Sequence, residues 1–144
     1  MAYLLITEAV GRSGSSQLTL IDVPTHPQLA AYAIWDPEVR TDGIARMVLL
    51  NLAVRNISTS ASDAEEMSVT VDVGELVKRR GSAIPSEAAV KRMSSPGLDS
   101  KDVSKVLWAG QSYESGIPLG EELVESTRNR RVTVQGSEGV LVFF

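Results

Sequence analysis

The sequence predicts an all-β fold, an antiparallel β-sandwich of about seven or eight strands with a short N-terminal helix. Short β-rich segments recur along the chain and are separated by glycine, proline and aspartate residues that favour turns. Residues 66–73 alternate between polar and apolar side chains, as expected for a strand with one buried face. Residues 44–53 are apolar on both faces at their centre, which indicates a strand buried between two layers.

The N-terminal segment differs from the rest of the chain because it favours a helix. Residues 2–10 are mostly apolar and end at Gly11, a residue type suited to a helix C-terminus. Gly14 and its serine neighbours then interrupt the chain. We therefore expect residues 1–11 to form a short helix and residues 17–144 to form the β-sandwich domain.

The expected strands follow one another at short spacing. In the strand over residues 66–73, Met67, Val69, Val71 and Val73 are expected to face the core. The other expected elements are strands over residues 17–23, 29–36, 44–53 and 87–93, a loop over residues 56–65, a short strand or anchor at residues 106–108, and a hairpin that pairs residues 131–135 with residues 140–144 across Gly136-Ser137-Glu138-Gly139.

Composition and charge exclude several classes of partner. Apolar residues make up 43% of the chain and charged residues 22%, as in an ordinary globular domain. The formal charge of −4 argues against nucleic acid, because phosphate binding needs a concentrated basic face. The basic run Lys78-Arg79-Arg80 fits a solvated turn better than a phosphate or heparin patch. No apolar run reaches the roughly 20 residues that a membrane helix needs, so no membrane partner is expected.

The cellular compartment is left open by the sequence. There are no cysteines, which excludes disulfides and thiolate-bound metals but does not distinguish compartments. The apolar start at residues 1–6 is too short for a signal peptide and has no basic flank or cleavage site. Either the protein stays where it is made, or the start of a longer chain is missing.

No catalytic arrangement is predicted. His26, the single histidine, lies between two prolines in a turn, and no Gly-x-Ser-x-Gly motif supplies a nucleophile. One histidine without cysteine cannot supply the three ligands of a usual metal site, and no phosphate-binding motif is complete. The carboxylates of residues 63–66 and of Glu121-Glu122 fall in polar loops, unlike the paired carboxylates of a glycosidase. We predict no catalytic residue, no metal and no cofactor.

Aromatic side chains are the best candidates for a binding site. The segment Trp-Ala-Gly-Gln-Ser-Tyr places the amide of Gln111 beside the rings of Trp108 and Tyr113. With Trp35, these residues form a candidate carbohydrate-binding set, because sugar sites combine an aromatic platform with hydrogen-bonding amides. A role as core anchors is the competing interpretation. Separately, Asn56-Ile57-Ser58 matches the acceptor motif for N-glycosylation, which matters only in a secreted chain.

Several segments, in consistent order, are similar to one known domain. They are VKRMSSPGLDSK at residues 90–101, WAGQSY at 108–113, Gly120-Glu121-Glu122 and GSEGVLVFF at 136–144, with residues 30–35 and 43–52 as the first two strands. These segments resemble the C-terminal β domain of glycoside hydrolase family 79, the fungal and bacterial β-glucuronidase group related to heparanase. The similarity covers nearly the whole chain.

The resemblance implies how this domain is used in its family. There, an upstream (β/α)₈ barrel carries two catalytic glutamates, and the C-terminal domain packs against it as a β-sandwich. Residues 2–10 resemble the end of the barrel's last helix, so Tyr3, Leu5 and Ile6 would face the barrel. Without a barrel, we expect the chain to self-associate. A strand taken from the start of the full chain would leave a sheet edge open here, and an enzyme of this family would be secreted.

Two functions follow from these observations. The first is a non-catalytic accessory domain that supports a glucuronidase-like barrel. The alternative is a free-standing, lectin-like protein whose partners are glycans, an idea that rests on fold-level analogy. An active small enzyme has no residues in this sequence to support it.

Overall fold

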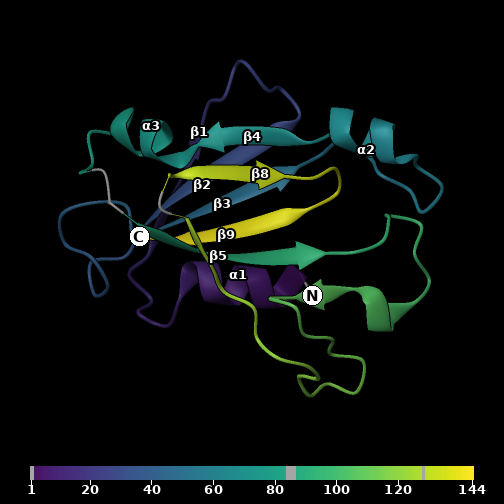
Figure 1. Ribbon diagram of the computed structural model, residues 1–144. Helices are drawn as coiled ribbons and strands as arrows, with labels where there is room; N and C mark the ends of the chain where they lie inside the picture. Colours follow the sequence, from purple (N-terminus) through teal and green to yellow (C-terminus); the bar gives the residue numbers. More distant parts are fainter. Residues whose placement is uncertain (1, 84–86, 128) are drawn as a thin grey trace.

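The chain folds into two antiparallel sheets with a helix on the outside (Figure 1). This computed structural model describes residues 2–83, 87–127 and 129–144, and Met1 of the expected N-terminal helix lies outside that part. Nine strands are found in the described residues, so the predicted β fold with a short N-terminal helix is confirmed. None of the helices in the described part is long and apolar enough to cross a membrane.

The large sheet has seven strands in the order β1-β2-β3-β9-β5-β6, and β7 pairs with β5 beside this path. The small sheet consists of β4 and β8. The elements are α1 (Ala2–Val10), β1 (Gln17–Ile21), β2 (Leu29–Trp35), β3 (Arg46–Asn51), α2 (Ala61–Glu66), β4 (Val69–Asp72), α3 (Val73–Lys78), β5 (Ala88–Ser94), the 3-10 turn η1 (Val103–Lys105), β6 (Leu107–Trp108), β7 (Glu125–Thr127), β8 (Arg131–Val134) and β9 (Gly139–Phe143).

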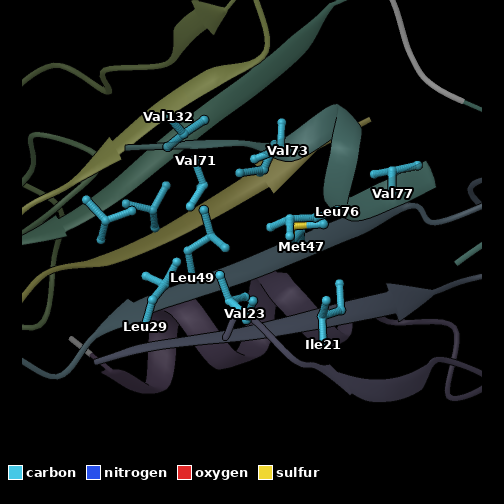
Figure 2. Close-up of a cluster of buried hydrophobic side chains, with 14 of the residues drawn as sticks. Ile21, Val23, Leu29, Met47, Leu49, Val71, Val73, Leu76, Val77 and Val132 are labelled. Atoms are coloured by element: carbon cyan, nitrogen blue, oxygen red, sulfur yellow. The ribbon is translucent and has the colours of Figure 1, made fainter. Parts of the chain in front are cut away.

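The large sheet is buried on both faces at its centre. On β3, Met47 and Leu49 belong to the core under the small sheet and α3, where Figure 2 shows them clustered with Val71 and Leu76. The intervening Val48 belongs to a second core, under α1. Alternate side chains of a strand point to opposite faces, so a run of apolar residues is needed only where both faces are covered. The prediction of a strand between two layers is confirmed.

The helix α1 has the bounds predicted from the sequence, and Gly11 ends it in the left-handed conformation with φ of 73°. Two further helices were not predicted. The expected loop over residues 56–65 contains the start of α2, whose N-terminus is capped by the Ser60 side chain accepting from the Asp63 amide. The expected strand over residues 66–73 is shorter at both ends. Helix α2 runs to Glu66 and β4 begins at Val69. The strand ends at Asp72, which caps α3 by accepting from the amides of Gly74 and Glu75.

The predicted hairpin at the C-terminus is wrong. Strand β8 pairs with β4, whereas β9 lies between β3 and β5, so the turn at residues 135–138 carries the chain from one sheet to the other. The burial patterns explain the difference. Only Val132 and Val134 of β8 are buried, as in an outer sheet with one wet face, while β9 is buried on both faces along most of its length.

Candidate functional site

The structure separates Trp35 from the other candidate carbohydrate-binding residues. Trp108 packs in the core under α1, whereas Trp35 packs against the core on the opposite face of the large sheet. The Trp108 side chain is 1% exposed, and its indole N–H donates to Glu8 Oε1 at 2.8 Å. A ring needs an exposed face to serve as a platform, so the geometry of Trp108 fits the core-anchor interpretation.

Gln111 and Tyr113 are close to each other, near Trp108 in the same loop. The Tyr113 hydroxyl donates to Gln111 Oε1 at 3.2 Å, and Gln111 Nε2 donates to the Gly120 carbonyl at 3.1 Å. The amide is therefore engaged within its own loop. Sugar binding by these residues stays a prediction. Asn56, the glycosylation candidate, lies exposed in a turn closed by the Thr59 amide on the Asn56 carbonyl, and its modification also stays a prediction.

The acidic residues singled out in the sequence lie in two different parts of the fold. Residues 63–66 form the C-terminal part of helix α2, where the acidic side chains are exposed to solvent. Glu122 accepts from Lys91 Nζ at 2.6 Å. His26 lies in the turn between β1 and β2, where its amide donates to the Val23 carbonyl. Within the described residues no group of three or more histidine, cysteine, aspartate or glutamate side chains could hold a metal ion.

Two polar contacts fix α1 on the large sheet, and the sequence did not reveal them. The first centres on Glu8, which accepts from Trp108 through Oε1 and from Lys91 Nζ through Oε2 at 2.7 Å. Burial alone would lower the pKa of Lys91, but the carboxylates of Glu122 and Glu8 raise it, so its ammonium group stays charged. The Lys91 ammonium also lies 5.7 Å from the centroid of the Phe143 ring.

The second contact is a buried ion pair at the C-terminal end of α1. Arg46 Nη1 lies 2.9 Å from Asp36 Oδ2 and donates to the Ala9 carbonyl at 3.2 Å. Burial alone would raise the pKa of Asp36, but the bonds from Arg46, Ser13 and the Glu38 amide lower it below 3.8. Because Arg46 satisfies a carbonyl of the last helical turn, the ion pair fixes where α1 ends on the sheet.

The outer side of α1 and the neighbouring strand β1 expose large apolar side chains. We call this surface the apolar strip, and its residues with their exposed fractions are Tyr3 77%, Ile6 56%, Val10 42%, Leu18 57% and Leu20 56%. Along it runs an apolar groove of about 220 Å³, lined by residues of α1, β1, β2 and β3. Leu5 was expected to share this outward face, but it is 4% exposed and packs on the large sheet.

A second group of charges joins the two sheets at a wider groove of about 530 Å³. Arg92 binds both oxygens of Glu125, at 2.7 and 3.0 Å, and donates to the carbonyl of Thr133 and to Glu138. Burial raises the pKa of the Glu138 carboxyl above 4.5, against the opposing effects of the Gln135 amide and Arg92. Arg92 donates to a carbonyl of β8, which pairs with β4 alone among the strands of the described residues, so this charge shields an open sheet edge.

Comparison with known families identifies the class of this domain. Residues 31–141 match the model described as "Glycosyl hydrolase family 79 C-terminal beta domain". The match covers most of the chain, and the chain belongs to this family. The matched region is the β domain and not the catalytic barrel. The resemblance inferred from the sequence motifs is therefore confirmed.

The fold is similar to that of a solved enzyme structure. It is a 4-O-α-L-rhamnosyl-β-D-glucuronidase from Fusarium oxysporum 12S in a complex with Rha-GlcA, with a TM-score of 0.61 and 24% sequence identity. The alignment covers 88% of this chain and 26% of that one, so this chain spans about a quarter of the length of that enzyme. At this identity the likeness concerns the fold alone. A comparison with curated proteins gives no match.

Proposed function

We propose that this chain is a non-catalytic accessory domain that supports the catalytic barrel of a family 79 glycoside hydrolase. The observation that carries the proposal is the apolar strip. Tyr3, Ile6 and Leu18 are each more than half exposed, and Ile6 and Leu18 line the same apolar groove. Burying a large apolar side chain from full exposure contributes about 1.5–3 kcal/mol, and roughly half of that remains to be gained by covering Ile6 or Leu18. A surface of this kind marks an interaction site when it is contiguous.

The way α1 is held supports a role as the junction between the two domains. Its inward residues Leu5 and Ala9 are buried in the core, while Glu8 and the carbonyl of Ala9 are held by charged partners. A domain that covers the outer side of α1 would thus be held at a defined angle to the sandwich. In this proposal residues 1–11 are the end of the barrel and residues 17–144 are the sandwich domain.

The sequence of the natural messenger RNA tests this proposal. A (β/α)₈ barrel encoded in frame before residue 2 is the expected result. A messenger whose reading frame encodes no barrel would contradict the accessory role. As a second measurement, the purified 144-residue chain should not hydrolyse an aryl glucuronide. Hydrolytic activity that copurifies with the chain would contradict its non-catalytic nature.

A second candidate function is carbohydrate binding by a free-standing, lectin-like protein. The observation that favours it is the position of Trp35, which is half-buried and borders a groove lined mostly by polar residues. A glycan array probed with the purified chain tests this function. Binding to a defined group of glycans is the expected result, and an array without binders would contradict it while leaving the accessory role untouched.

A further inference from the structure

Trp35 lies at the edge of a groove of about 460 Å³ that is lined mostly by polar residues, on the face of the large sheet opposite to α1. This volume falls within the range of about 300–1,000 Å³ that is usual for small-ligand sites. One side of the ring packs against the sandwich core, which fixes the side chain. The groove is lined by Ser15, Gln17, Thr19, Trp35, Pro37, Arg40, Thr41 and Gly43.

Two parts of the fold hold the walls of this groove in place. Gln17 is the cross-strand partner of Trp35, and Thr19 is the partner of Ala33, so both side chains share the face of the ring. The opposite wall is the turn after β2. There the amides of Val39 and Arg40 donate to the carbonyl of Asp36, at 3.0 and 2.9 Å. The backbone that carries the polar side chains is therefore in place before any ligand arrives.

The groove offers hydrogen-bonding groups that the protein itself leaves unused. Among the residues that the structure describes, no partner is found for the indole N–H of Trp35 or for the side chains of Gln17, Thr19 and Thr41. They provide an amide, two hydroxyls and one N–H donor around an aromatic ring. This combination suits a ligand with an apolar face and several hydroxyl groups.

The charge of the groove restricts the ligand further. Arg40 is the charged side chain in the lining, and its Nε binds Asp42 Oδ1 at 2.9 Å. The same guanidinium donates to the carbonyls of Ile44 and Ala83, so it is already engaged. An acidic ligand would need an unpaired cation, because a desolvated carboxylate or phosphate is costly without one. The groove therefore suits a neutral ligand.

We propose that the groove beside Trp35 is a carbohydrate-binding site for a neutral pyranoside. The C–H face of the sugar ring stacks on the indole, and its hydroxyls bond Gln17, Thr19 and Thr41. The site is independent of the accessory role. Residues Tyr32 and Ile34 of the same strand belong to the core under α1, whereas Trp35 is on the other face. A barrel that covers the apolar strip leaves this groove open.

A glycan array of neutral and acidic oligosaccharides, followed by titration calorimetry with the best neutral binder, tests the site. Trp35→Ala should weaken binding about tenfold or more, a change of roughly 1.4 kcal/mol. Trp35→Phe keeps an aromatic ring but loses the N–H, so its affinity should lie between those of the wild type and Trp35→Ala. Tyr3→Ala is the matched control, because it removes an exposed aromatic side chain from the apolar strip and should leave the affinity unchanged.

Three results would overturn the proposal: no glycan bound, binding confined to acidic glycans, or the same affinity for folded Trp35→Ala and wild type. If circular dichroism shows that Trp35→Ala is unfolded, the double variant Gln17→Ala/Thr41→Ala is tested in its place. Both of these side chains are exposed, and no hydrogen bond or ion pair of either is found within the described residues. The double variant should also lose at least about tenfold in affinity, and unchanged affinity would contradict the site.

Discussion

The two faces of the large sheet are covered in different ways. The face under the small sheet and α3 is closed by aliphatic side chains such as Val73, Val77 and Val134, each with 0% exposure. The face under α1 is closed by one short helix (Figure 1). Beside that helix, Leu18 and Leu20 remain more than half exposed. The first face is a finished core, and the second retains a surface that can take a partner.

The difference also concerns the kind of force that holds each layer. Apolar packing is not directional, so the aliphatic core stabilises the sandwich without fixing one orientation by itself. Hydrogen bonds and ion pairs require defined geometry. At α1, Glu8 and the Arg46–Asp36 pair provide that geometry at two separate points of the helix. A helix that transmits the position of another domain needs such directional contacts.

The largest expected effect is the loss of a side chain from the finished core. Leu49→Ala should lower the free energy of unfolding by about 2–5 kcal/mol, because the closed aliphatic layer cannot fill the cavity. Leu5→Ala removes the same group under α1, where the helix can settle onto the sheet, and should lie at the lower end of this range. Urea denaturation measures both variants. A larger loss for Leu5→Ala would contradict the contrast between the faces.

An intermediate effect on the free energy of unfolding is expected from pH through Asp36, which lies at the end of α1. The pKa of Asp36 is lower in the folded chain than its ordinary value of 3.8. Its stabilising contribution is therefore present above that value and is lost as the pH falls through the lowered pKa. The urea midpoint of the wild type should exceed that of Asp36→Asn by the largest amount at about pH 5. This difference in midpoint should become smaller towards about pH 2.5. A gap that is constant with pH would show that the charge of Asp36 does not matter.

The smallest effect on stability, with a clear effect on association, is expected in the apolar strip. The isolated chain should self-associate through this surface, and Leu18→Glu should make it monomeric in sedimentation velocity. Because Leu18 is 57% exposed, the free energy of unfolding should change by at most about 0.5 kcal/mol. Ile117→Glu is the control, since Ile117 is 65% exposed in a loop outside the strip, and it should leave association unchanged. A monomeric wild type would contradict the prediction.

Local signals accounted for the elements that were predicted correctly. The apolar run before Gly11 gave the bounds of α1, and the alternation of Val69 and Val71 located β4. Signals for the missed helices were also present, since Ser60 and Asp72 are each followed three residues later by an acidic residue, as in a helix N-terminus. Strand β7 is only three residues long and polar, so no periodicity could indicate it.

The position of the candidate site depends more on tertiary structure than the positions of the helices and strands do. From the sequence, Trp35 and Trp108 are equally good candidates for a binding site, because both are aromatic residues in β-rich segments. Only the fold separates them, with Trp108 buried at 1% exposure against Glu8, 100 residues away in the chain. The contact between Arg46 and the carbonyl of Ala9 is likewise a long-range contact without a local pattern. Such pairs are set by how the sheet brings distant segments together.

By itself, the sequence determined the β class, the N-terminal helix, the strand buried on both faces and membership of the family. These properties follow from periodicity, turn residues and motifs, which act over a few neighbouring residues. The tertiary structure decided that β8 and β9 lie in different sheets, that α1 is held by Glu8 and Arg46, and that Trp35 borders a groove. Each of these depends on which segments meet across the core, and no local pattern encodes that choice.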